Sequence, residues 1–403
     1  MDHCLRNRNW SNMPDDIIHL IVEKLRFYPY HRKAAAVCQD WYRITKEVHG
    51  SFNQNSILLL LPYNNMSEKC AFYEIYGSKT YELNLPNFHD KLVHGSSNGW
   101  VCVGDEDLNL SIINPLTRKE IKLPYPSYAI EVLQGNRPAD FFRDPYIRLS
   151  ILTKFAVLGN PFSTTGFGFA AIMSTYKELF VCRLGDTDWT PIKVRDPDPF
   201  CYDTCRSLHD LLYFKEKLVA INSGQEVTIV DFDGSNCMAR YVRGPNYQLG
   251  DQYGSPSRMS SSTGLANLRY YLVENYGKLL AIRRLGEYLS DLEGTKTVCF
   301  ELFQFDECNE TWNMIHGLGE QCVFLGQNAS VSVSAVDIPG CRPNCIYFTE
   351  DFNKGYCECE SQFRNDNGVF CFDDGTVEMF NISHSLSHWL SPSLWCQVNV
   401  SAS

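Results

Sequence analysis

Residues 10–44, WSNMPDDIIHLIVEKLRFYPYHRKAAAVCQDWYRI, carry the clear helical periodicity of this chain. Pro14 suits a first helical turn, and the carboxylates of Asp15 and Asp16 favour the positive end of a helix dipole. A second helical run follows over residues 32–43. The apolar residues of the first run have the spacing that places one stripe on a helix: Ile17, Ile18, Ile21, Val22 and Leu25. We therefore predict two short helices.

These residues resemble an F-box. The family pattern Leu-Pro-x-Asp/Glu before an apolar helix is matched by Met13-Pro14-Asp15-Asp16, with methionine in place of leucine, and Val-Cys-x-x-Trp is matched by residues 37–41. The resemblance implies that the helices bind a Skp-type adaptor through apolar contacts. The expected adaptor-binding residues are Met13, Pro14, Ile17, Ile18, Ile21, Leu25, Val37 and Trp41. A helical hairpin that caps the following domain is the alternative.

Composition describes a folded globular protein, with 44% hydrophobic and 21% charged residues among 403. No apolar run approaches the ~18 residues of a membrane span, and residues 1–6 do not resemble a signal peptide. The formal net charge is −11, and no basic stripe suggests a nucleic-acid surface. We expect a protein of the nucleus or cytoplasm that binds neither nucleic acid nor membrane.

Cysteine is frequent, with 17 residues. The odd number and the scattered positions favour reduced thiols over a disulfide framework. One group, Cys341, Cys345, Cys357 and Cys359, lacks the paired CxxC spacing of a zinc ribbon. We expect no metal site and no cofactor.

From Ile57 onward the apolar period changes from about 3.6 to about 2, and short strands alternate with turns. Groups of three or four strands recur over residues 99–124, 169–194, 208–231, 268–306 and 322–373. This repetition predicts a mainly β protein: a flexible segment 1–9, a helical domain 10–48, a linker 49–56 and a single β-propeller of about six blades over residues 57–400. Two β-sandwich domains are the alternative.

Three segments share a tryptophan and resemble one repeated outer strand: residues 188–192, 311–315 and 394–398. Residues 125–145, 196–205 and 244–264 are predicted to be loops, because they are rich in Pro, Gly, Asp, Ser and Tyr. An incompletely closed ring exposes a strand edge. We therefore expect the apolar segment 57–61 and the last strand-like segment, 395–400, to complete one blade together.

With the propeller half included, the chain resembles plant F-box proteins that carry a KIB-type propeller. The motifs behind this resemblance are Gly99-Trp100-Val101, Asn114-Pro115-Leu116-Thr117, Leu123-Pro124, residues 344–349 and residues 368–375. It implies a substrate-recognition subunit of an SCF ubiquitin ligase, linked to a cullin through the adaptor and holding a protein substrate on the propeller. These motifs are structural, so they leave the substrate-binding residues unknown.

An enzyme is the alternative from another class. No HExxH motif and no Walker loop occurs. Residues 166–171 fit GxGxxA, but strand-like residues follow where a dinucleotide site needs a helix. His384 and His388 have helical spacing within a polar stretch. We expect no catalytic residue; a propeller that binds proteins outside an SCF complex is the remaining alternative.

Overall fold

The computed structural model of the chain contains two compact units, residues 1–56 with 398–403, and residues 57–397. The structure describes residues 10–25, 30, 34–51, 56–61, 69–75, 79–134, 151–159, 168–173, 178–192, 207–233, 236–245, 266–290, 294–338, 340–351, 366–380 and 394–398. Within these ranges, no helix is long and apolar enough to cross a membrane.

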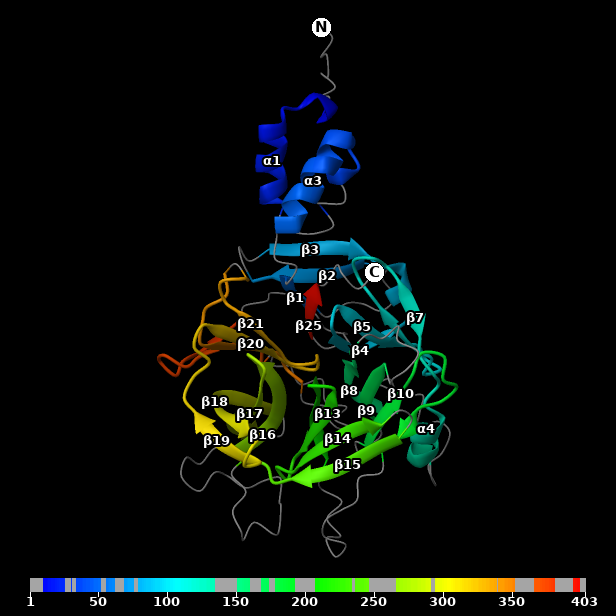
Figure 1. Ribbon diagram of the computed structural model, residues 1–403, viewed down its shortest axis with the longest axis vertical. Coiled ribbons are helices and arrows are strands. Elements are labelled where there is room, and N and C mark those ends of the chain that lie inside the picture. The colour runs from blue at the N-terminus through cyan, green and yellow to red at the C-terminus, as the bar shows by residue number, and fades with distance from the viewer. Residues whose placement is uncertain are drawn as a thin grey trace, which may run out of the picture. The chain divides into compact units, whose positions relative to one another are not determined.

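The smaller unit contains helices, as its sequence pattern predicts (Figure 1). They are the 3-10 helix η1 (Trp10–Asn12) and the α-helices α1 (Asp15–Lys24) and α3 (Gln39–Ser51). Pro14 has an extended backbone, with φ −60° and ψ 143°, so α1 begins at the next residue. The second helical run is interrupted: residues 34 and 35 are helical, residues 36–38 form a turn in which the amide of Val37 donates to the carbonyl of Ala34, and α3 begins at Gln39.

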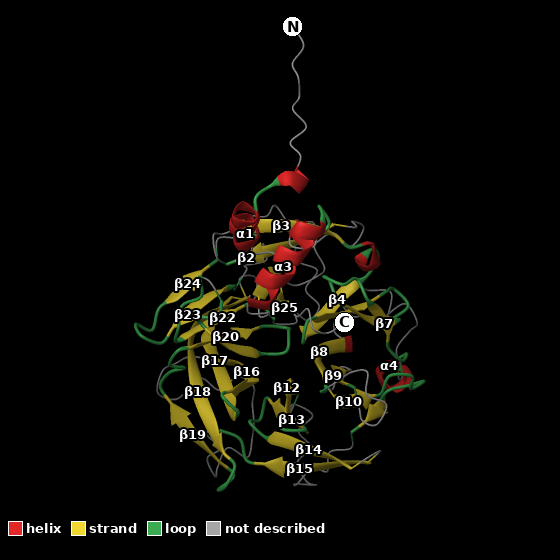
Figure 2. Cartoon of the chain, turned by 45° about the horizontal axis from the view of Figure 1, so that its top comes forward, coloured by secondary structure: helices red, strands yellow, loops and turns green. Residues whose placement is uncertain are grey.

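The larger unit contains six β-sheets arranged around a common centre (Figure 2). The sheet β25-β1-β2-β3 comprises β1 (Ser56–Leu60), β2 (Lys69–Glu74), β3 (Lys79–Asn84) and β25 (Leu394–Val398). The sheet β4-β5-β6-β7 comprises β4 (Leu92–Ser97), β5 (Trp100–Gly104), β6 (Leu110–Ile113) and β7 (Glu120–Lys122). The sheet β8-β9-β10-β11 comprises β8 (Leu152–Val157), β9 (Phe169–Met173), β10 (Glu178–Cys182) and β11 (Thr190–Pro191).

The remaining three sheets complete the ring. The sheet β12-β13-β14-β15 comprises β12 (Leu208–Phe214), β13 (Lys217–Asn222), β14 (Val227–Asp233) and β15 (Asn236–Val242). The sheet β16-β17-β18-β19 comprises β16 (Ala266–Asn275), β17 (Lys278–Ser290), β18 (Gly294–Asp306) and β19 (Thr311–Ile315). The sheet β21-β20-β22-β23-β24 comprises β20 (Gln321–Leu325), β21 (Val331–Ser334), β22 (Cys345–Phe348), β23 (Gly368–Cys371) and β24 (Val377–Met379).

The larger unit is therefore a six-bladed β-propeller, and two sandwich domains are not supported. The first strands of neighbouring sheets contact one another in the series β4, β8, β12, β16 and β21, so these are the inner strands. Ser96 on β4 donates a hydrogen bond to the carbonyl of Trp395 on β25, which places β25 in the same inner ring. The pairing of β25 with β1 confirms that strands from both ends of the propeller complete one blade.

The expectation that residues 394–398 form an outer strand is wrong, because β25 is the innermost strand of its sheet. Leu394, Trp395 and Cys396 are all buried in succession. A strand covered on both faces shows such a continuous apolar run instead of alternation. An outer strand would expose one of its faces.

The three recurring tryptophans share one contact that accounts for their repetition. The indole N–H of Trp189 donates to the carbonyl of Pro124 at 2.9 Å, and that of Trp312 donates to the carbonyl of Arg243 at 3.0 Å. The indole N–H of Trp395 donates to the carbonyl of Leu325 at 3.2 Å. In each case the acceptor belongs to the preceding sheet or directly follows it, so each tryptophan links two neighbouring blades.

The blade that contains β20 to β24 is the fifth when blades are counted from β4 and the blade shared by β25 and β1 is counted last. It departs from the simple meander. Its sheet has five strands, and β20 pairs in parallel with β22, with Cys322 opposite Cys345 and Leu325 opposite Phe348. The chain runs from β20 back along β21 on the inner side, and then crosses to the other side of β20. The sequence predicts these strands but not their order.

One of the expected loops contains a helix. Residues 127–134 form α4 (Ser127–Gln134), in which Ala129 and Ile130 are buried. Burial of these two side chains explains why a helix replaces an irregular connection. Residues 196–205 and most of 244–264 lie outside the described part of the chain.

Candidate functional site

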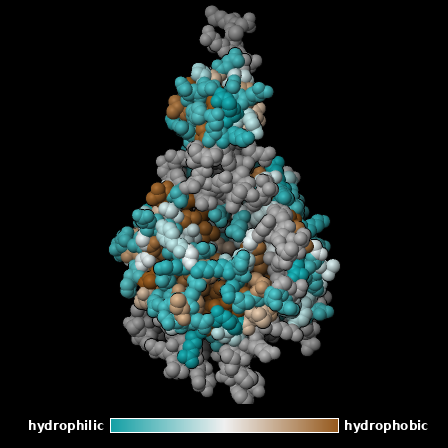
Figure 3. Space-filling view, viewed as in Figure 1, coloured by the Kyte–Doolittle hydropathy of each residue, from teal (hydrophilic) through white to brown (hydrophobic). Residues whose placement is uncertain are grey.

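The helical unit has a small core and an exposed apolar stripe. Its core is formed by Ile18, Val22, Ala34, Trp41, Ile44 and Val48. On α1, Ile17 is 42% exposed and Leu20, three residues later, is 51% exposed. Residues three apart on a helix lie side by side. Figure 3 shows hydrophobic side chains on the α1 side of this unit among mostly hydrophilic ones.

The structure divides the expected adaptor-binding residues into three groups. Ile18 and Trp41 are 0% and 3% exposed, so they hold the helices together and are not available for contact with a partner. That part of the expectation needs correction. The other six remain available: Pro14, Ile17 and Val37 are exposed, and Met13, Ile21 and Leu25 are half-buried against the core.

Leu20 was missed by sequence reasoning. Ile17, Ile18, Ile21 and Leu25 define one stripe, and Leu20 lies beside it. The sequence contained a signal for it, because the apolar face of residues 17–25 is wider than a single stripe. When an apolar face is wider than the core can cover, some of its residues stay exposed. A large exposed leucine next to an exposed isoleucine is the kind of anchor that a partner groove accepts.

Polar contacts hold α3 against α1. The Arg43 guanidinium donates to the Asp15 carboxylate at 2.6 Å and to the Glu47 carboxylate at 3.4 Å. Hydrogen bonding and attraction to Asp15 raise the pKa of Arg43. Arg43 and Asp15 are about half exposed, so their ion pair between the two helices adds little stability, and the Arg43–Glu47 pair lies within α3.

The propeller axis contains a second candidate site, built by a repeated irregularity. The inner strands β4, β8, β12 and β16 each have a register shift next to their second or third residue. A bulge re-aims the side chains beside it. The residues that follow the four shifts are Gly95, Lys154, Asp210 and Arg269. Three of the four are charged.

Lys154 and Asp210 form a fully buried ion pair, with exposures of 1% and 0%. The Lys154 ammonium lies 3.1 Å from the Asp210 carboxylate and donates to the carbonyls of Gly326 at 2.6 Å and Asn328 at 2.9 Å. Burial lowers the pKa of Lys154, and the Asp210 charge opposes this shift. Gly95, at the equivalent position of β4, leaves room for the carbonyl of Gln327, since a Cβ there would lie 3.1 Å from that oxygen.

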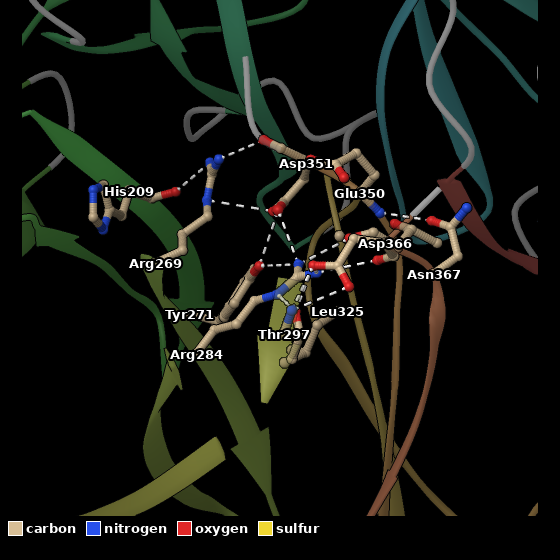
Figure 4. A network of polar contacts seen from close by, with 12 residues as sticks. His209, Arg269, Tyr271, Arg284, Thr297, Leu325, Glu350, Asp351, Asp366 and Asn367 are labelled. Atoms are coloured by element: carbon tan, nitrogen blue, oxygen red, sulfur yellow. Dashed lines mark hydrogen bonds and ion pairs between the residues drawn. The ribbon is translucent and has the colours of Figure 1, made fainter. Parts of the chain in front are cut away.

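A second set of buried charges lies beside this pair (Figure 4). The Arg284 guanidinium, which is 0% exposed, contacts the carboxylates of Asp366 at 2.9 Å and Asp351 at 3.3 Å. The Arg269 guanidinium lies 3.4 Å from Asp351, and the Tyr271 hydroxyl donates to Asp351 at 3.0 Å. These residues come from β16, β17 and the segments that flank β22 and β23.

The charges of this axial cluster balance. Its buried cations are Lys154, Arg269 and Arg284, and its buried anions are Asp210, Asp351 and Asp366. Burial and the Asp351 charge raise the pKa of Tyr271. Burial alone would lower the pKa of Arg284, but Tyr271, Asp351 and Asp366 outweigh it and raise the value. Balanced, fully buried charges with hydrogen-bonded partners suit the joining of blades.

His94 adds a neutral buried group to the inner ring. Burial lowers the pKa of its imidazole to about 4, and a hydrogen bond to the backbone of Leu152 opposes the shift. Gly104 lies against the ring, since a Cβ there would approach His94 Nε2 to 2.8 Å. His94 is thus held uncharged at neutral pH.

Residues 95–99, Gly-Ser-Ser-Asn-Gly, fit the spacing of a GxSxG nucleophile motif. In the structure they join β4 to β5 in a hairpin, whereas that motif requires a strand, a sharp turn and a helix. The Ser97 hydroxyl accepts a hydrogen bond from the amide of Val157 at 3.0 Å, so it serves the contact between two blades.

Among the described residues, no group of three or more His, Cys, Asp or Glu side chains has the geometry to hold a metal ion. Cys341 and Cys345 are described, while Cys357 and Cys359, as well as Gly166, His384 and His388, lie outside the described residues.

Known proteins similar to this chain share both of its parts. The family model for the KIB1-4 beta-propeller matches residues 72–373. F-box only protein 7 of Arabidopsis thaliana is 25% identical over 96% of this chain and 95% of its own length. F-box protein SKIP23 of the same plant is 24% identical, covering 92% and 91%. F-box protein KIB3 is 25% identical, covering 83% and 70%.

The matched range begins in β2 and ends directly after β23, so it includes strands from all six blades. The relatives extend the similarity across the helical unit. The chain belongs to the KIB1-4 beta-propeller family, as a plant F-box protein with a KIB-type propeller.

Proposed function

We propose that this protein is the substrate-recognition subunit of an SCF-type ubiquitin ligase, in the nucleus or cytoplasm. The helical unit binds a Skp-type adaptor, the adaptor links it to a cullin, and the propeller binds a protein substrate. The exposed Ile17–Leu20 stripe carries the proposal, because the core of the helical unit is complete without these two side chains. The F-box names of the relatives support it.

Adaptor binding is a contact between apolar helical surfaces. A few large apolar anchors supply most of the affinity in such interfaces. Ile17 and Leu20 provide two anchors on one face of α1, and Val37, which is 38% exposed, adds a third from the segment before α3. Ile18 and Trp41 act indirectly, since they fix the helices that present the anchors.

The propeller contributes the position of the substrate and no chemical step. Holding a substrate close to a ubiquitin carrier raises its effective concentration, so the receptor needs no catalytic group of its own. The charged side chains of the axial cluster are buried and paired with one another, so they are not available to a substrate. Substrate recognition is therefore assigned to the rim and loops of the propeller.

The adaptor contact is tested with the double substitution Ile17→Asp and Leu20→Asp in the full chain. Two exposed positions are chosen, because a charge at Ile18 would enter the core and unfold the unit. Loss of one interface anchor costs about 2 kcal/mol or more, so we expect adaptor affinity to fall at least about 30-fold. Binding of purified adaptor is measured by surface plasmon resonance.

The matched control is Met238→Asp with Met314→Asp, which adds the same charge at positions 61% and 49% exposed on β15 and β19. This control should bind the adaptor like the wild type. Unchanged adaptor binding by a folded Ile17/Leu20 variant would overturn the proposal. Affinity purification with and without residues 10–48 gives a second test: adaptor and cullin peptides should vanish with the deletion, while substrate peptides remain.

A further inference from the structure

Four cysteine side chains meet in the fifth blade. Cys322 lies on β20, Cys345 on β22 and Cys371 on β23, and Cys341 lies in the segment before β22. All four belong to or pack against one hydrophobic cluster that also contains Trp395. Cys322, Cys345 and Cys371 are opposite one another on neighbouring strands and share one face of the sheet, and Cys341 packs against the same cluster.

Cys345 and Cys371 are directly opposite each other on the antiparallel strands β22 and β23. The amide of Phe372 donates to the carbonyl of Asn344 at 3.0 Å, one residue beyond each cysteine. This pattern makes Cys345 and Cys371 a non-hydrogen-bonded pair, in which the Cα atoms are ~4.5 Å apart. Disulfides form between Cα atoms separated by ~4.4–6.8 Å.

The two thiols already contact each other. Burial raises the pKa of Cys345 to about 12, and a hydrogen bond to the Cys371 sulfur adds to the shift. The Cys371 thiol in turn donates to the Asp373 carboxylate at 4.0 Å. Cys345 is 0% exposed, whereas Cys371 is partly exposed, so a small oxidant can reach one member of the pair.

We propose that Cys345 and Cys371 form an oxidation-sensitive dithiol, a modification site at which a peroxide joins β22 to β23 by a disulfide. The pairing is set by strand register. Oxidation would fix the β22–β23 pair of the fifth blade in its folded register. Reduction by a small thiol or a dithiol reductase would restore the free cysteines.

The chemistry is balanced with hydrogen peroxide as the oxidant. Cys371 loses its proton to water, and its sulfur attacks one peroxide oxygen. The O–O bond breaks, hydroxide leaves, and Cys371 becomes a sulfenic acid. The Cys345 sulfur then attacks the Cys371 sulfur, the S–O bond breaks, and water leaves with the Cys345 proton. Two thiols lose two electrons in total, and peroxide becomes two waters.

Cys322 and Cys341 also contact each other, Cys341 is partly exposed, and the hydrogen bond to Cys322 lowers the pKa of Cys341, but Cys341 lies outside β22, so no strand register places it opposite Cys322. Other neighbouring thiols among the described residues are enclosed. Cys102 lies near Cys182, and Cys70 lies near Cys396, but all four are buried. Cys308 is exposed on the turn after β18. The Cys345–Cys371 pair combines direct register opposition with one accessible sulfur.

The test uses the full-length protein, reduced, freed of reductant and then treated with hydrogen peroxide. Free thiols are alkylated, the chain is digested, and cross-linked peptides are identified by mass spectrometry. We expect a peptide pair joined through Cys345 and Cys371 that disappears on reduction. Cys371→Ser should abolish this pair, while the matched control Cys308→Ser should retain it.

Circular dichroism after oxidation checks that the fold is intact, since unfolded chains exchange disulfides without selection. Two results would overturn the proposal. One is that Cys345 and Cys371 are still free thiols, and are therefore alkylated, after treatment with peroxide concentrations that oxidise Cys308. The other is that Cys371 is linked to a different cysteine, such as Cys322. Cys371→Ser replaces a partly exposed side chain, so this variant should fold even where Cys345→Ser does not.

Discussion

Replacing Lys154 by Met should destabilise the propeller strongly, because it leaves the Asp210 charge without its cation. Asp210 is 0% exposed and keeps hydrogen bonds from the amides of Leu211 and Leu272, both at 2.9 Å. These bonds do not neutralise the carboxylate. The carbonyls of Gly326 and Asn328 lose their donor as well. Breaking a buried ion pair from one side costs about 3–5 kcal/mol.

This cost translates into a measurable shift of the melting temperature. The entropy of unfolding is about 2.1 cal/mol/K per residue, which for the ~340 residues of the propeller unit gives about 0.7 kcal/mol/K. A loss of ~3–5 kcal/mol therefore lowers the melting temperature by ~4–7 °C. Differential scanning fluorimetry and calorimetry at pH 7 measure this shift.

Two further variants separate the charge effect from lost packing. Adding Asp210→Asn to Lys154→Met removes the unpaired charge, so the double variant should recover part of the lost stability. Lys217→Met is the matched control, because the Lys217–Asp231 pair is 45% and 34% exposed and such pairs contribute ~0–1 kcal/mol. A Lys154→Met protein that melts as the Lys217→Met protein does would refute the reasoning.

Three other outcomes are expected. Removing residues 392–403 deletes β25 with its buried Trp395, so the protein should aggregate or melt many degrees lower, whereas a chain ending after Val398 should do neither. Size-exclusion chromatography and melting curves measure this. A truncated chain that stays monomeric and melts like the full-length protein would contradict it. His94 binds its proton with a pKa of about 4 in the folded protein against 6.5 when unfolded, so the folded state takes up fewer protons and stability falls as pH drops through this window. Denaturant titrations at neutral and acid pH measure the fall in the free energy of unfolding, and this fall should be about 3 kcal/mol smaller in His94→Gln than in the wild type. An equal pH dependence in both proteins would show that the ring is not buried. Elemental analysis should find no stoichiometric zinc, and one zinc per chain that is lost in Cys357→Ser with Cys359→Ser would reveal a metal site.

The sequence predicts those parts of the fold that local geometry controls. The spacing of Ile18, Val22 and their neighbours predicts α1, and the alternation over 208–231 predicts β12, β13 and β14. Strands β2, β3 and β15 were not recognised, because most of their residues are half-buried or exposed and strongly apolar side chains are few in them.

Contacts between distant segments could not be predicted. The parallel pairing of β20 with β22 depends on how β21 enters the inner ring, and nothing in residues 321–348 alone determines that order. The inner position of β25 likewise depends on its partner β1 at the other end of the propeller. Register is set by the completed sheet.

The candidate sites show the same division. Helical spacing indicated the apolar residues of α1, but their separation into core and surface depends on the packing of α3. Lys154 stands within the run 152–157, in which four of the six residues are apolar, and this signals a buried charge that needs a partner. Its partner Asp210 lies on another blade, so the sequence shows the need for a counter-charge without showing its position.

The shared blade of β25 and β1 also determines when during synthesis the protein can finish folding. At ~5–20 residues per second, a ribosome needs roughly 17–70 s to make the ~340 residues from β1 to β25. Throughout that interval β1 has an unpaired edge, and closing a loop of ~340 residues costs about 5 kcal/mol of chain entropy before the edge is covered. Five blades can form while the chain grows, but the sixth waits for its last strand. A newly made chain therefore exposes this edge until translation has passed residue 398, and a premature stop before β25 leaves the edge open to aggregation.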